Sequence, residues 1–69
     1  MGLEWKQFDV VSLRDGIPEA GVSPGTRAVI LDVYDDPSRA YEVEVVDEQT
    51  GKTVWWGAVT PDKLEPFTS

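Results

Sequence analysis

The sequence predicts an all-β fold, and three observations support this prediction. In residues 41–46 apolar and charged side chains alternate strictly, as expected for a strand with one buried face and one solvated face. Residues 52–56 are rich in β-branched and aromatic types, and a loop ending in Gly51 joins the two segments, which is typical of a hairpin. Residues 26–34 are apolar nearly throughout, so this strand should be at least partly covered on both faces.

Turn signals divide the chain into five expected strands. Asp15–Gly16 ends the first strand, and Pro37 ends the second because proline lacks a backbone N–H. Gly51 supplies the positive φ of the hairpin loop, and Gly57 predicts a bulge or a close backbone approach within the fourth strand. Threonine and proline at residues 60–61 predict a short helical turn. The expected strands are residues 8–14, 26–34, 40–46, 52–59 and 64–67.

A long loop is expected at residues 17–25, which contain two prolines and two glycines. Ile17, Ala20 and Val22 are apolar within it, so we expect the loop to cover one end of the core. The alternative is a binding site, because long ordered loops often carry one. This order of elements predicts a small SH3-like five-stranded barrel, whose closure would remove most exposed edges.

Length and composition limit the chemistry. The 69 residues form one domain, which we place at residues 8–69 behind an N-terminal arm at residues 1–7. The chain contains no cysteine and no histidine, so it lacks disulfides and the commonest zinc ligands and general bases. No serine, threonine or lysine lies in a recognisable nucleophile motif. We therefore expect no enzymatic activity, no cofactor and no metal.

The net charge of −7, from 13 acidic and 6 basic residues, predicts the class of partner. It repels phosphate backbones and anionic membrane surfaces, so we expect neither nucleic acid nor membrane as a partner. It suits a basic protein partner, although an acidic surface also simply favours solubility. No apolar run is long enough for a membrane span, and the first residues lack the pattern of a signal peptide. We therefore expect a cytoplasmic protein of undetermined oligomeric state.

Two groups of carboxylates are candidate sites. Asp32, Asp35 and Asp36 are close in sequence, and Glu42 and Glu44 share one strand face. Such oxygens can bind Ca²⁺, but the spacing is not that of an EF-hand. Turn chemistry and a solvated strand face explain the two groups better. We expect them to steer a basic partner instead, and the residues expected to bind protein besides the tryptophans are Tyr34, Asp35, Asp36, Glu42, Glu44, Asp47 and Glu48.

The adjacent Trp55 and Trp56 are the sharpest indication of a binding surface. Neighbouring residues of a strand point to opposite faces, so one tryptophan enters the core and the other points outward. Tryptophan is enriched at binding hot spots. The alternative is that the outward tryptophan is covered by the arm around Trp5 or by the loop at residues 17–22. The aromatic residues do not show the spacing of a groove for proline-rich peptides.

Several sequence blocks together resemble a known family. The blocks FDVVSL (8–13), IPEAGV (17–22), AYEVEVVD (40–47) and DKLEP (62–66) are similar in order and spacing to those of short, mostly bacterial proteins known only as a domain of unknown function. This chain differs from the family pattern at Ala28, at Val45 and at Trp55–Trp56. The last difference suggests a partner of its own. The resemblance implies an SH3-like barrel without known enzymatic activity, and relatives encoded beside small toxin-like proteins suggest an antitoxin or immunity role.

The first functional hypothesis is therefore a non-enzymatic, acidic protein-binding module, of the antitoxin or immunity type, that binds a basic toxin or nuclease. Its carboxylates steer the association, and the outward tryptophan is the anchor. The alternative is a structural or accessory subunit that stabilises a larger enzyme complex. The two differ in their effect on the partner, whose activity would fall in the first case and would depend on this chain in the second.

Overall fold

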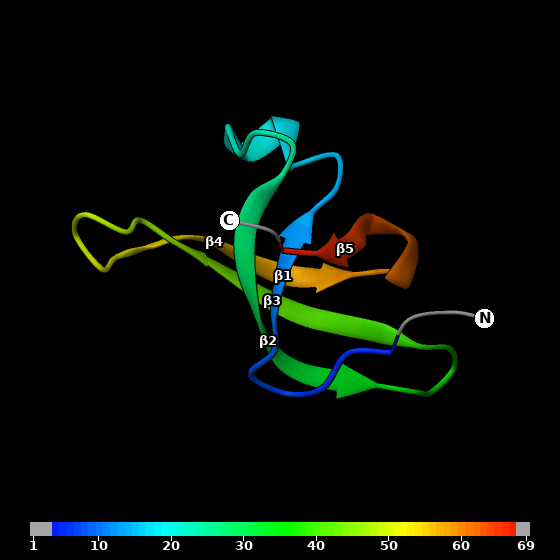
Figure 1. Ribbon diagram of the computed structural model, residues 1–69. Coiled ribbons are helices and arrows are strands. Elements are labelled where there is room, and N and C mark those ends of the chain that lie inside the picture. The colour runs from blue at the N-terminus through cyan, green and yellow to red at the C-terminus, as the bar shows by residue number, and fades with distance from the viewer. Residues whose placement is uncertain (1–3, 68–69) are drawn as a thin grey trace.

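The computed structural model describes residues 4–67. Residues 1–3 of the expected arm and residues 68–69 of the expected domain lie outside the described residues. The strands form one antiparallel sheet in the order β4-β3-β2-β1-β5 (Figure 1). The elements are β1 (Val10–Leu13), the 3-10 helix η1 (Pro18–Ala20), β2 (Thr26–Tyr34), β3 (Ala40–Val46), β4 (Thr53–Val59), the 3-10 helix η2 (Pro61–Lys63) and β5 (Leu64–Pro66).

The all-β prediction is confirmed, and the expected helical turn before the last strand is η2. β1 begins later than expected because Phe8 has a φ of +73°, which is incompatible with an extended strand. Phe8 occupies the third position of a turn in which the Asp9 N–H donates to the Lys6 carbonyl at 3.0 Å. The Phe8 N–H then donates to the Ile30 carbonyl at 2.7 Å, so this turn leads directly into the pairing of β1 with β2.

The predicted five-stranded barrel is wrong in its closure, because the sheet is open. In residues 4–67, β4 pairs only with β3, and β5 pairs only with β1. β5 is only three residues long and ends at Pro66, which has no N–H to donate to another strand. Bulges at Ile30/Asp32 and Val45/Val46 increase twist and bending, and Figure 1 shows β1 and β2 running steeply across β3 and β4.

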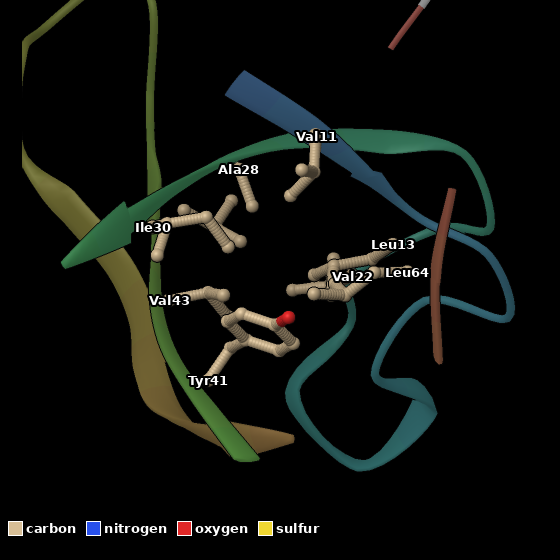
Figure 2. Packing of buried hydrophobic residues seen from close by; sticks show 9 residues of the cluster. Val11, Leu13, Val22, Ala28, Ile30, Tyr41, Val43 and Leu64 are labelled. Atoms are coloured by element: carbon tan, nitrogen blue, oxygen red, sulfur yellow. The ribbon is translucent and has the colours of Figure 1, made fainter. Parts of the chain in front are cut away.

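The core lies on the inner face of this bent sheet. Val11 and Leu13 point inward and are almost completely buried. Figure 2 shows side chains from β2 and β3 pointing toward those of β1, of the loop after η1 and of β5. The buried apolar cluster consists of Val11, Leu13, Val22, Ala28, Ile30, Tyr41, Val43, Val45 and Leu64.

The loop at residues 17–25 covers this core, as expected. Val22 is buried, Ile17 and Ala20 pack against the cluster, and Ile17 forms a β-bridge with Val22. Gly16 makes the preceding turn possible, because a Cβ at its position would lie 2.3 Å from the Val22 carbonyl oxygen. The φ of Gly16, +66°, also favours glycine.

The N-terminal arm is attached to the core through Tyr41. Trp5 packs against the buried cluster, and its backbone N–H donates to the Tyr41 hydroxyl oxygen at 3.2 Å. The Arg39 guanidinium donates to the same oxygen at 3.2 Å and pairs with Asp35. A buried hydroxyl needs polar partners. The Tyr41 hydroxyl has one in the arm and one at Arg39, so it connects the arm to the β2–β3 turn.

Candidate functional site

The two tryptophans of β4 have opposite environments. Trp55 is half-buried and packs against the core, whereas 64% of the surface of Trp56 is exposed. Trp56 is therefore the outward tryptophan, and neither residues 4–7 of the arm nor the loop at residues 17–22 covers it. Gly57 allows Trp55 to lie against the inner face, since a Cβ at Gly57 would be 2.8 Å from the Trp55 ring. The prediction of a close approach at Gly57 is thus confirmed.

Trp56 lies beside a row of carboxylates on the outer face of the sheet. Glu44 of β3 is directly opposite Trp56 of β4, and Glu42 is opposite Ala58. Directly opposite residues have Cβ atoms about 4.5–5.5 Å apart. On the other side of β3, Asp32 of β2 pairs with Glu42.

Hydroxyl groups on the neighbouring strands hold both glutamates in place. The Tyr34 hydroxyl of β2 donates to Glu42, and the Thr53 hydroxyl of β4 donates to Glu44. No cationic side chain among residues 4–67 forms an ion pair with either glutamate. We call the set Tyr34, Glu42, Glu44 and Trp56 the outer-face cluster.

Besides Trp55, which packs against the core, four predicted binding residues do not join this cluster. Asp35 and Asp36 lie in the β2–β3 turn, whereas Asp47 and Glu48 lie in the β3–β4 loop, which projects from the body of the molecule (Figure 1). These loops are at opposite ends of the seven-residue strand β3, roughly 20 Å apart at the usual rise of a strand. Asp35 is already paired with Arg39, and the Asp47 side chain caps its own loop by accepting from the Gln49 N–H at 2.8 Å.

Three ionisable groups have shifted pKa values. The hydrogen bond to Glu42, with the charges of Glu42 and Asp32, raises the pKa of Tyr34. The Tyr41 hydroxyl and Asp35 raise the pKa of Arg39, while the Thr60 hydroxyl lowers the pKa of Asp62. The first shift belongs to the cluster, because its largest cause is the hydrogen bond that the Tyr34 hydroxyl donates to Glu42.

No group of three or more acidic side chains within residues 4–67 is arranged to hold a metal ion. The two 3-10 helices of these residues are only one turn long, and none of the described helices could cross a membrane. The outer-face cluster places fixed carboxylates beside an exposed aromatic ring. This combination can bind an ammonium or guanidinium group.

A cleft of about 490 Å³ lies next to β4 on the side away from β3. Trp55, Ala58 and Val59 form one wall, and residues 15–19 form the other. The sequence does not predict this cleft, because closure of the expected barrel would remove the free edge of β4. The 70% exposure of Phe8 was also not predicted, because a left-handed phenylalanine has no sequence signal.

A family model for a domain of unknown function (DUF4926) matches residues 7–66. The chain belongs to this family, since the match covers most of its length. No curated protein and no solved structure matches the chain. The predicted resemblance to a domain of unknown function is thereby confirmed, and the family name assigns no activity.

Proposed function

We propose that this chain is a non-enzymatic protein-binding module whose outer-face cluster binds a basic partner. The observation that carries the proposal is the position of Trp56, which is 64% exposed and directly opposite Glu44. Exposing a tryptophan on a sheet face costs solubility, and tryptophan is enriched where partners bind. The carboxylate beside it has no cationic partner among the described residues.

The chemistry of the cluster suits a lysine or arginine of the partner. A cation above the Trp56 ring gains about 0.5–2 kcal/mol, depending on how far it is desolvated. Glu44 and Glu42 are held by hydroxyls, so little side-chain freedom is lost when they accept hydrogen bonds from that cation. The net charge of −7 attracts the partner over a longer range, and added salt weakens this attraction.

Within this proposal the fold is SH3-like. The strand order, the long loop after β1 and the helical turn before β5 support this assignment. A bacterial, cytoplasmic antitoxin or immunity protein that binds a basic toxin or nuclease is the specific form of the proposal. The net charge of −7 suits a basic partner, and the absence of cysteine fits the cytoplasm.

Affinity capture from the native host tests the proposal. The bait is compared with three variants: Trp56→Ala, Glu42→Lys/Glu44→Lys and Asp47→Lys/Glu48→Lys. The two double variants change the net charge equally, but only the first alters the cluster. We expect Trp56→Ala and Glu42→Lys/Glu44→Lys to abolish capture, whereas the loop variant retains it at reduced level. If all three variants capture the same protein as well as the wild type does, the outer-face cluster is not the binding surface.

The effect on the captured partner distinguishes the specific forms of the proposal. Purified partner is assayed with increasing amounts of this chain and, as a control, of Trp56→Ala. An antitoxin or immunity role requires that the partner's activity fall as the wild-type chain is added. A partner that gains activity or solubility instead would identify an accessory subunit.

A further inference from the structure

The two edges of the sheet differ in how they are protected. Natural proteins protect an edge strand by making it short or by placing charge or proline on it. β5 has all three protections: it is only three residues long, Glu65 is charged, and Pro66 is a proline. β4 has seven residues from Thr53 to Val59, and none of them is charged or proline.

The free edge of β4 is available for pairing. No backbone hydrogen bond joins Thr53–Val59 to any described segment other than β3. The 490 Å³ cleft lies along this edge, and its opposite wall is the loop that contains Ile17 and Pro18. An added strand would run about 4.8 Å from β4, within this cleft.

The surroundings of β4 determine which side chains such a strand would carry. On the outer side, a residue next to Trp56 would extend over the ring toward Glu44, which favours lysine or arginine. On the inner side, the neighbours are Trp55, Val59 and Ile17, which favour an apolar side chain. Because strand side chains alternate between faces, the complementary segment alternates basic and apolar residues.

We propose that the edge of β4 pairs with an extended segment of the partner in which basic and apolar residues alternate. This inference rests on the proposed function, because it specifies how the basic partner binds. A second copy of this chain is a poorer occupant, since each copy carries a net charge of −7 and like charges oppose the pairing.

The probe is a short synthetic peptide that alternates lysine and valine, added to the isotopically labelled full chain. A control peptide of the same sequence carries N-methyl groups on alternate amides, so it keeps its charge but cannot pair through its backbone. We expect the unmodified peptide to shift the amide signals of Val54–Ala58 and slow their hydrogen exchange. The methylated peptide should bind about tenfold more weakly, because several backbone hydrogen bonds are lost.

Two lysine variants locate the binding. Ala58→Lys places a charge on the edge strand, and Val10→Lys places the same charge on the outer face within β1. Val10 is 38% exposed and Ala58 is also exposed, so both variants should fold. Ala58→Lys should weaken peptide binding about tenfold because a lysine on an edge strand opposes pairing, and Val10→Lys should weaken it no more than about twofold because its charge is remote and screened.

Equal affinity for the methylated and unmethylated peptides would overturn the pairing, as would an absence of binding by either. Shifts of Val54–Ala58 that grow with protein concentration alone would identify a second copy as the occupant and overturn the proposal as stated. The proposed function has a separate test. If the two peptides bind equally well but Glu42→Lys/Glu44→Lys still weakens their binding, the backbone pairing is wrong and the proposed function stands. If this charge reversal leaves peptide binding unchanged, the result counts against the proposed function.

Discussion

The inner and outer faces of β4 have different surroundings, although they belong to one short strand. On the inner face Trp55 packs against the core, with its ring above Gly57. On the outer face Trp56 is exposed and lies opposite Glu44. Two identical, adjacent side chains thus differ only in the direction that strand geometry gives them. We therefore expect substitutions of Trp55 to alter stability and substitutions of Trp56 to alter the proposed binding.

The largest expected effect is that of Trp55→Ala. Removing this half-buried ring leaves a cavity beside the core, and we expect a loss of about 2–4 kcal/mol in the free energy of unfolding. Trp56→Ala should change it by no more than about 0.5 kcal/mol, as is usual for exposed positions. Urea unfolding monitored by circular dichroism measures both variants. Equal losses in the free energy of unfolding would mean that the two faces of β4 contribute equally to stability.

Gly57→Ala tests whether the inner face depends on the Trp55 ring. The added methyl group would be 2.8 Å from that ring, so we expect a loss of about 1–3 kcal/mol from overpacking. In a Trp55→Ala background the same substitution should be neutral or stabilising, because the obstructing ring is absent and alanine has less backbone entropy to lose than glycine. Losses that simply add in the double variant would contradict this coupling.

Phe8 extends the comparison to a second exposed aromatic residue. Its left-handed conformation, with φ of +73°, costs of order 1–3 kcal/mol in a non-glycine residue. Phe8→Gly should therefore stabilise the fold by about 0.5–2 kcal/mol, after the entropy cost of glycine is included. Val10→Gly, in regular strand structure, is the matched control and should destabilise it. Thermal unfolding provides the comparison, and destabilisation by both substitutions would show that Phe8 is not strained.

The smallest effect concerns Tyr34 on the outer face. The pKa of Tyr34 is raised, chiefly by its hydrogen bond to Glu42, so Glu42→Gln should lower this pKa toward its ordinary value. Glu44→Gln is the control, because Glu44 accepts from Thr53 instead. A raised folded-state pKa stabilises the protein below the ordinary tyrosine pKa, and this contribution disappears as pH rises through the folded-state value. Titration of the Tyr34 ring signals by NMR measures the shift; identical shifts in both variants would refute the assignment.

The sequence predicted the local structure well, because turn residues and alternation act locally. The bounds of the strands at residues 26–34 and 40–46 are as expected, and the buried members of β3 follow its alternation. Closure of the sheet depends on where distant strands meet in space, which turn residues and local alternation do not determine. The choice between Trp55 and Trp56 likewise depended on the register of β4 with β3.

The candidate site was predicted only in part for the same reason. Tyr34, Glu42, Glu44 and Trp56 share one face because neighbouring strands bring them together. Their hydroxyl–carboxylate pairs depend on cross-strand register. Asp35 and Asp47 were grouped with them by charge alone, but the fold pairs Asp35 with Arg39 and places Asp47 in a distant loop.

The pairing of β1 with β5 has a consequence for how the chain folds. β2, β3 and β4 follow one another as a meander whose contacts are local in sequence, whereas Leu13 pairs with Leu64 from opposite ends of the chain. Closing so long a loop carries an entropic cost that the hairpins avoid. The meander can therefore form first, and the two chain ends join it last. We also expect β5 to be the first described strand to detach in transient openings of the native state, because it has three residues and pairs only with β1.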